Sequence, residues 1–233
     1  MLFICALATL ALALALPATA APAPQPIAKR DLSDLPLNAQ LKLADTADEH
    51  YKLLPNDSDF VYDFNKDAVV ATNQNWPALT GVGASFSMGA LPACGMAFLH
   101  LHPRATELFS LHSGRVLSEM IPESVVDADG AQRKINVELT AGMVTLYPQG
   151  SFHTQVNPDC EPANFTAAFT SEEFSAGLVA KQLFGFSDDV LENTFGGAVE
   201  GEDIERLRGK IPEGALVLVE ECLAKCGREK RAI

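Results

Sequence analysis

The stretch from Gly95 to Gly114 restricts the fold of this chain more than any other, because it places His100 and His102 two positions apart and Glu107 shortly after them. In an extended strand, side chains two positions apart point to the same face. Both imidazoles therefore point to one place, and Pro103 then interrupts the strand. Glu107 begins a second apolar segment that can lie beside the first. The sequence thus brings a carboxylate next to two imidazoles.

This combination of ligands suits a borderline divalent metal such as manganese, iron or zinc. An isolated His-x-His pair also fits two ordinary histidines on a half-buried strand, so a further ligand is needed to favour a metal. The stretch Gly142–Asn157 supplies one. It predicts a strand over Met143–Tyr147, a turn at Pro148-Gln149-Gly150, and a further strand that carries His153. The two stretches together predict a site of three histidines and one glutamate.

The two stretches resemble the two motifs of the cupin superfamily. The first has a glycine, His-x-His, a glutamate and a second glycine, and the other has Gly142, Pro148-x-Gly150, His153 and Asn157 at the spacing of the second motif. With His-Pro-Arg-Ala-Thr-Glu in the first motif, the chain is similar to germin-like proteins, and most similar to their fungal and slime-mould spherulin branch. The resemblance implies a jelly-roll β-barrel that binds manganese through the four ligands His100, His102, Glu107 and His153.

Short apolar segments bounded by glycine or proline predict an all-β domain. The expected strands are Asp59–Phe64, Leu79–Met88, Ala97–His102, Glu107–Leu111, Arg115–Ile121, Ile135–Leu139, Met143–Tyr147, Phe152–Val156 and Phe165–Thr170. Apolar residues at three- and four-residue steps predict a helix from Leu37 to Leu54. From about residue 186 we expect helices after Ser187, over Glu202–Arg208 and over Ala215–Cys226. The fold class is therefore a cupin jelly-roll β-barrel with an N-terminal helix and a C-terminal helical extension, which the germin resemblance places against a neighbouring subunit of a homo-oligomer.

The beginning of the chain has the pattern of an exported protein. Residues 1–20 form an apolar segment that ends in Ala18-Thr19-Ala20, which predicts a signal peptide. Residues 21–30 end in Lys29-Arg30, which fits either a cleaved pro-peptide or an ordinary exposed basic pair, and residues 31–233 are expected to form a single cupin domain. The net charge of −13 disfavours nucleic acid and anionic lipid as partners. We therefore expect a secreted protein, extracellular or in the cell wall, that is not bound to a membrane after signal removal.

Four of the five cysteines remain once Cys5 leaves with the signal peptide. An even number in an exported chain predicts two disulfides. Cys222 and Cys226 lie four apart in a segment expected to be helical, so we predict a Cys222–Cys226 bond, which leaves Cys94–Cys160. The alternative joins Cys94 to a C-terminal cysteine. Asn56 and Asn164 begin N-glycosylation sequons.

The positions of further residues in the two motifs predict which of them surround the ligands. Asn157, Gln149 and Thr106 either support the metal ligands or simply form turns. The germin resemblance implies oxalate oxidase and superoxide dismutase activities, but the family commonly has an asparagine just before His-x-His, where this chain has Ala97-Phe98-Leu99. A second family asparagine is also missing near Ser85 to Ser87. Without these donors a buried carboxylate would lack hydrogen bonds, so oxalate oxidation is doubtful.

Three functions follow from these residues. The first is a manganese-binding germin-like cupin with superoxide-dismutase-type activity, although Fe²⁺, Zn²⁺ or Ni²⁺ would accept the same ligands. The second is a non-catalytic extracellular or wall-associated stress protein, as the spherulin resemblance implies. The third is an isomerase, dioxygenase or cyclase acting on an organic secondary metabolite, which the apolar pair Phe98 and Leu99 would admit.

Overall fold

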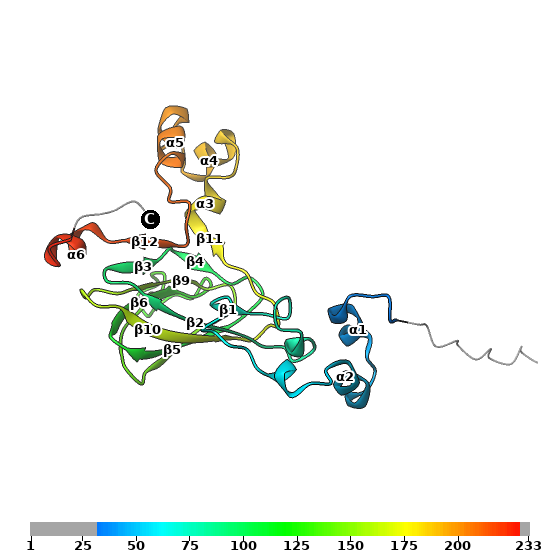
Figure 1. Ribbon diagram of the computed structural model, residues 1–233. Coiled ribbons are helices and arrows are strands. Elements are labelled where there is room, and N and C mark those ends of the chain that lie inside the picture. The colour runs from blue at the N-terminus through cyan, green and yellow to red at the C-terminus, as the bar shows by residue number, and fades with distance from the viewer. Residues whose placement is uncertain (1–31, 229–233) are drawn as a thin grey trace, which may run out of the picture. The chain divides into compact units, whose positions relative to one another are not determined.

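Two antiparallel sheets form the centre of the computed structural model, which describes residues 32–228 (Figure 1). Along the first sheet the strands follow the order β1, β2, β10, β5 and β8. Their bounds are Val70–Ala71, Ser85–Leu91, Ala163–Phe169, Glu107–Ser113 and Val144–Tyr147, in the same order. Every neighbouring pair in this sheet is antiparallel, and every pair except β1 with β2 joins strands that are not consecutive in the chain, which is the connectivity of a jelly roll.

The second sheet has β9 (Phe152–Val156) at its centre. On one side β9 pairs with β4 and β3, and on the other with β6, which pairs in turn with β7. Two short strands from the C-terminal part complete it, because β11 pairs with β4 and β12 pairs with β3 (Figure 1). The bounds are Gly95–Ala97 for β3, His100–Leu101 for β4, Arg115–Ile121 for β6, Ile135–Thr140 for β7, Gly177–Leu178 for β11 and Leu216–Leu218 for β12.

The hydrophobic core lies between the two sheets. Phe109, Leu111 and Phe169 come from the first sheet, and Val116 and Leu139 come from the second; all five are almost completely buried. Along β6 buried and more exposed residues alternate, which is the pattern of a strand with one face on a core. The all-β prediction, with helices towards both ends of the domain, is therefore confirmed.

The N-terminal helix predicted over 37–54 is two helices, α1 (Leu37–Leu43) and α2 (Ala47–Leu53). The break has a local cause, because Ala44 is extended and the Thr46 side chain caps α2 by accepting a hydrogen bond from the Glu49 amide at 3.2 Å. The apolar periodicity continues across this break, so it could not reveal it.

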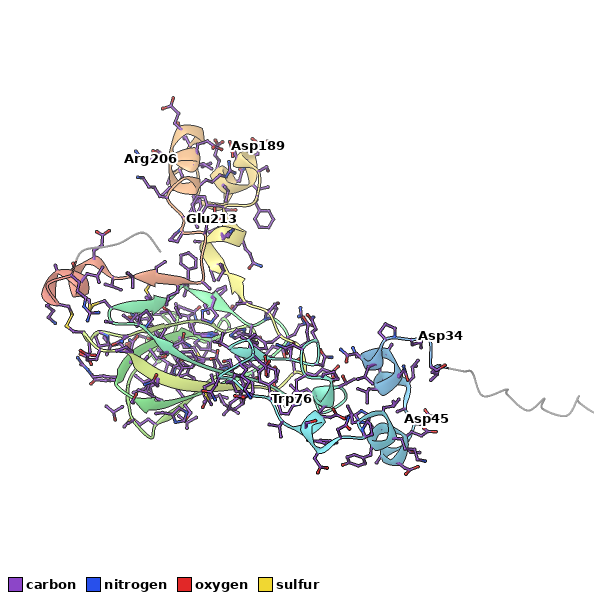
Figure 2. The ribbon with its side chains drawn as sticks, viewed as in Figure 1. Asp34, Asp45, Trp76, Asp189, Arg206 and Glu213 are labelled. Carbon is purple, nitrogen blue, oxygen red and sulfur yellow. A yellow bond between two sulfur atoms is a disulfide. The ribbon has the colours of Figure 1, made fainter. Side chains whose placement is uncertain are left out.

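The strand predicted over Asp59–Phe64 is wrong. Asp57–Phe60 forms the 3₁₀ helix η1, in which the Asp59 side chain accepts a hydrogen bond from the Asn56 amide. The indole of Trp76, which precedes η2 (Pro77–Leu79), donates to the Asp59 carbonyl at 2.9 Å (Figure 2 labels Trp76). These local hydrogen bonds satisfy the backbone groups that a strand would have offered to a neighbour. The strand predicted over Leu79–Met88 likewise begins only at Ser85.

The C-terminal part contains α3 (Val179–Leu183), α4 (Asp188–Thr194) and α5 (Gly201–Arg208). Asp189 on α4 and Arg206 on α5 are labelled in Figure 2, and each helix buries one apolar side chain completely, Leu191 on α4 and Ile204 on α5. The helix predicted over Ala215–Cys226 is wrong in its first half, which forms β12, and right in its second, which is α6 (Glu220–Lys225). The free edge of β3 accepts this short apolar run as a strand, a choice that periodicity cannot make.

Both predicted disulfides are wrong, and the alternative that joins Cys94 to a C-terminal cysteine is the one the structure contains. The bonds are Cys94–Cys222 and Cys160–Cys226, with Cα atoms 5.4 and 5.5 Å apart. The pairing of β12 with β3 brings the start of α6 onto Cys94, where the Val219 amide donates to the Cys94 carbonyl at 2.9 Å. Cys222 and Cys226 therefore point to different partners instead of to each other.

The described residues from Leu35 onward belong to one compact unit. The predicted signal peptide (1–20) and pro-peptide (21–30) lie outside the described residues. Between residues 32 and 228 no helix is long and apolar enough to cross a membrane. Both sequon asparagines are exposed, with Asn56 just before η1 and Asn164 within β10, and their glycosylation stays a prediction.

Candidate metal centre

Four side chains from both sheets converge between them. His100 on β4 lies opposite His153 on β9 in the second sheet, and His102 directly follows β4. Glu107 begins β5 in the first sheet and faces them. One ligand atom from each of the four lies within 4.8 Å of the other three. The grouping predicted from the two motifs is therefore present in the structure.

A backbone carbonyl holds each of the three imidazoles. The Nδ1 atoms of His100, His102 and His153 lie 2.7, 2.9 and 2.9 Å from the carbonyl oxygens of Phe98, Ser175 and Ser151. A carbonyl oxygen can only accept a hydrogen bond, so Nδ1 carries the proton in each ring. Each Nε2 is then left with its lone pair, which is how metal-binding histidines are oriented.

The lone pairs of the histidines meet the carboxylate of Glu107. Its Oε2 lies 3.0 Å from Nε2 of His102 and 3.1 Å from Nε2 of His153. With the ring protons on Nδ1, the two Nε2 atoms and the Glu107 oxygen are all hydrogen-bond acceptors. Acceptors this close to one another are unfavourable unless a positive charge lies between them. Three lone pairs and one carboxylate around a single point form a site for a cation.

The distances fit one first-row divalent ion. Bonds of about 2.1 Å to imidazole and carboxylate put adjacent ligand atoms of an octahedron about 3 Å apart and opposite ones about 4.2 Å apart. The separations of 3.0 and 3.1 Å match adjacent positions. Four protein ligands would leave two positions of a six-coordinate ion for water or a small substrate.

Burial and mutual proximity hold the ligands in the ionisation states that a metal needs. Burial, together with the neighbouring His153 and His102, lowers the pKa of His100 to about 4. Burial opposes the ionisation of Glu107, but the rings of His102 and His153, which would donate from Nε2 to this carboxylate when protonated in the absence of a metal, outweigh it and lower its pKa to about 2. At neutral pH His100 is therefore a neutral donor and Glu107 an anion.

Thr106 and Gln149 join the turns of the two motifs. The Gln149 amide donates to Oγ1 of Thr106 at 3.1 Å, and its side-chain amide donates to the Pro103 carbonyl at 2.8 Å. The Gly150 amide donates to the His102 carbonyl at 2.9 Å, in a turn where Gly150 has a φ of 78° that favours glycine. These bonds place His102 and His153 relative to each other, so Thr106 and Gln149 support the ligands through the backbone.

Asn157 does not support the metal ligands, which was one of the two roles that its motif position allowed. Its side-chain amide donates to the carbonyls of Leu91, Pro92 and Glu161 at 3.1, 2.9 and 2.7 Å. These bonds tie the loop before β3 to the loop after β9. Asn157 is therefore a turn-forming residue, the other interpretation of its motif position.

The three residues before the first histidine have three different surroundings. Ala97 packs beside the core and its carbonyl accepts a hydrogen bond from Thr154 at 2.6 Å. Phe98 is 8% exposed and supplies the carbonyl that binds His100, whereas Leu99 is 41% exposed. Phe98 and Leu99 interrupt the predicted strand Ala97–His102, which the structure divides into β3 and β4. Only one of the pair, Phe98, is buried, and neither lies in a strand, so strand alternation does not apply to them.

Sequence reasoning missed the aromatic residues that surround the ligands. Tyr147 stacks on His153 with ring centres 4.1 Å apart, and its hydroxyl hydrogen-bonds with Ser118 at 2.6 Å. Phe169 and Phe174 stack on each other at 3.6 Å and both contact the ring of His102 by their edges. Tyr147 lies inside the second motif, and alternation along its strand could have identified it as inward-facing. No motif spacing marks Phe169 or Phe174, which lie far along the chain.

The comparisons with known proteins agree with this geometry. Residues 57–203 match the family described as Cupin. The chain is 33% identical to spherulin-1A of Physarum polycephalum, over 82% of this chain and 79% of that protein. It is 31% identical to germin-like protein subfamily 2 member 3 of Arabidopsis thaliana, over 62% of this chain and 64% of that protein.

Among solved structures, recombinant oxalate oxidase in complex with glycolate has a similar fold. The TM-score is 0.55 at 22% sequence identity, and the match covers 66% of this chain and 83% of that one. At this identity the match supports the jelly-roll fold alone.

Proposed function

Because this chain belongs to the cupin family, with the spherulins and germin-like proteins as relatives, we propose that it is an exported manganese-binding cupin with superoxide-dismutase activity. The observation that carries the proposal is the set of three Nε2 lone pairs and one carboxylate that face a single point. Only a bound cation would balance the lone pairs and the negative charge of this set.

Manganese suits the ligand types. Three imidazoles and one carboxylate, without sulfur, form a site for a borderline to hard ion that prefers six ligands. Fe²⁺, Zn²⁺ and Ni²⁺ would accept the same donors, so the choice among them follows from coordination number and supply more than from affinity. Manganese bound here would supply a one-electron redox change, which dismutation uses to convert two superoxide ions and two protons into dioxygen and hydrogen peroxide.

The surroundings of the ligands favour a small substrate. His100 is the one ligand of the four that is not fully buried, so the approach to the site lies on its side. Phe169 and Phe174 cover His102, and Tyr147 covers His153. These aromatic rings keep water from the ligands and disfavour a ring-shaped organic substrate, which the third function would need.

Oxalate is a poor substrate for the same site. Ser85, where the family asparagine is missing, lies in one row of the first sheet with Phe169 and Glu107. Phe169 separates Ser85 from Glu107, and the Ser85 hydroxyl is buried with no hydrogen-bond partner among the described residues. Ala97 offers no side-chain donor either. A dianion of oxalate bound here would face aromatic carbon where it needs hydrogen bonds.

Metal analysis and a dismutase assay test the proposal. We expect wild-type protein to hold about one manganese per chain and to show the six-line Mn(II) electron paramagnetic resonance spectrum. His100→Ala should remove both the metal and the activity. His112→Ala is the matched control, because His112 is exposed on β5 and its Nε2 hydrogen-bonds with Thr166 at 2.8 Å. Manganese-replete protein without dismutase activity would eliminate the enzymatic part.

A second candidate function is structural, and one observation favours it. The ligands come from both sheets, so a bound metal would connect β5 to β4 and β9 across the core. Together with two disulfides, such a connection would make a protein resistant to heat and proteases. If chelation lowers the melting temperature but no redox turnover is measurable, this second function replaces the first.

Export and assembly are further parts of the proposal. The two disulfides support export, because such bonds persist in oxidising compartments. Leu108 and Leu146 support a homo-oligomer, because they lie opposite each other on β5 and β8 and are 42% and 49% exposed. Mass spectrometry of the protein from culture medium would locate its first residue, and light scattering would give the number of subunits. A monomer at micromolar concentration would contradict assembly.

A further inference from the structure

The four cysteines form two disulfides beside the second sheet, an inner one that is buried and an outer one that is more exposed. The inner disulfide is Cys94–Cys222, in which Cys94 is fully buried and Cys222 is 8% exposed. The outer disulfide is Cys160–Cys226, in which Cys160 is exposed and Cys226 partly so. A dissolved reagent can therefore reach the outer bond while the protein covers the inner one.

The two disulfides contact each other through one pair of sulfur atoms. The Sγ of Cys226 lies 3.6 Å from the Sγ of Cys94, to which it is not bonded. The sulfur atoms of Cys94, Cys222 and Cys226 all lie within 4.8 Å of one another, in a group that does not include Cys160. Cys226 is thus the member of the outer bond that is placed against the inner one.

We propose that the four cysteines form a thiol–disulfide exchange site, at which a small thiol reduces the Cys160–Cys226 bond and Cys226 then attacks Cys94. In the first step two thiol molecules become one disulfide, and Cys160 and Cys226 become thiols. In the second step the Cys226 thiolate forms a bond to Cys94 Sγ while the bond from Cys94 to Cys222 breaks, and Cys222 leaves as a thiolate. The second step changes no oxidation state, since one disulfide replaces another.

The chain entropy favours neither the native pairing nor the alternative one. A Cys94–Cys222 bond spans 128 residues and a Cys94–Cys226 bond would span 132, so the chain entropy of the two is nearly equal. Cys94 also has a φ of 57°, an unfavourable value for a residue with a side chain. The Cys94 amide donates to the Asp159 carbonyl at 3.0 Å, which keeps Cys94 beside Cys160. Cys94 is therefore already held beside the outer disulfide when Cys226 attacks it.

Exchange would change how α6 is attached. Cys222 and Cys226 lie one turn apart, so the new bond would move the attachment by about 6 Å along the helix. The strand β12 precedes α6 directly, and its neighbour Ala215 accepts a hydrogen bond from the Phe98 amide at 2.7 Å. A small thiol would in this way alter the C-terminal strand of the second sheet. This step does not depend on the proposed metal or activity.

Two serine variants of the full-length protein test the proposal. Cys160→Ser leaves Cys226 as a free thiol 3.6 Å from Cys94, whereas Cys226→Ser leaves Cys160 free outside the three-sulfur group. Each variant is labelled with N-ethylmaleimide under native conditions and mapped as non-reduced peptides. We expect Cys160→Ser to contain Cys94–Cys226 with labelled Cys222 in at least about a tenth of the molecules, a difference of no more than 1.4 kcal/mol between pairings. We expect Cys226→Ser to keep Cys94–Cys222 and to label only Cys160.

Two results would overturn the proposal. One is Cys160→Ser protein in which Cys226 alone is labelled and Cys94–Cys222 is intact. The other is exchange to the same extent in both variants, which would indicate general unfolding instead of proximity. Wild-type protein treated with less than one equivalent of dithiothreitol gives a second measurement that needs no substitution. There Cys160 should be labelled first, together with Cys226 or Cys222, and early labelling of Cys94 would contradict the proposed order.

Discussion

The metal centre takes a ligand from β4, whereas the C-terminal segment (residues 215–226, which contain β12 and α6) pairs with β3, and the two regions are held in place in different ways. His100, His102 and Glu107 lie within eight consecutive residues, and backbone carbonyls orient the rings. The C-terminal segment is held by disulfides between residues 128 and 66 positions apart. Local spacing therefore places three of the four metal ligands, whereas long-range pairing determines the whole C-terminal segment. This difference predicts that each region can be weakened with the other left in place.

Removing the inner disulfide should have the largest effect on stability. A cross-link that closes a loop of this length restricts the unfolded chain by about 5 kcal/mol in the chain-entropy model. We expect Cys94→Ala/Cys222→Ala to lower the free energy of unfolding in urea by about 3–5 kcal/mol. The folded variant should still bind manganese, measured by titration calorimetry. Complete loss of metal binding in a folded variant would show that the two regions are not separable.

Removing the metal should have the next largest effect. At a free metal concentration one hundred times the dissociation constant, binding stabilises the folded state by about 2.7 kcal/mol. For a domain of this size that corresponds to a fall in melting temperature of about 5–10 °C on chelation. Differential scanning calorimetry of chelated and manganese-loaded protein would measure it. Since the ligands come from both sheets, an unchanged melting temperature would argue against a metal shared between them.

Acidification should weaken the metal-free protein in two steps. His100 has a pKa of about 4 when folded and an ordinary value of 6.5, so the unfolded chain binds more protons between these values. Stability is therefore lost as the pH falls from 6.5 towards 4, by about 2 kcal/mol when the ring's partial exposure is allowed for. Glu107, with a pKa of about 2 against 4.5, adds a loss as the pH falls from 4.5 towards 2. Melting curves of chelated wild-type and His100→Asn protein test this, and equal slopes above pH 4 would contradict it.

The hydroxyl of Tyr147 should contribute least. Tyr147→Phe keeps the ring that stacks on His153 and removes the hydrogen bond to Ser118. We expect a loss of about 1 kcal/mol in unfolding free energy, and the double variant with Ser118→Ala should recover part of it because no buried hydroxyl is then unpaired. Manganese affinity should change little. A tenfold weaker affinity in Tyr147→Phe would instead assign the hydroxyl a role in positioning His153.

The sequence predicted the region where short-range spacing decides the structure. The strands Arg115–Ile121 and Phe152–Val156 have the bounds expected from alternation and flanking turns. The grouping of the four ligands also followed from spacing, because each motif places its histidines within one strand and its turn. The rings of Phe169 and Phe174 could not be predicted in the same way, since their contact with His102 depends on how a distant strand and loop return to the site.

Local spacing did not predict the structure of the C-terminal segment. A spacing of four between Cys222 and Cys226 indicates one helix face, and the structure does place both in or beside α6. Their partners, however, depend on β12 occupying the edge of β3, and the apolar run Leu216–Leu218 is compatible with helix or strand. Tertiary pairing decided both the strand and the disulfides. Local periodicity carries no information on which strands pair or which cysteines are bonded.

Each native disulfide joins an early cysteine to a much later one in or beside α6, which also has a consequence for biosynthesis. Neither native bond can form before Cys222 and Cys226 have been synthesised, and until then Cys94 and Cys160 are the cysteines of the described domain that can be oxidised to each other. A premature link between these two is the first mistake available to the nascent protein, and the hydrogen bond from the Cys94 amide to Asp159 would keep them near each other. Maturation must therefore either delay oxidation or reverse it, and if the protein is exported as proposed, the yield of correctly bridged protein should depend on a disulfide isomerase.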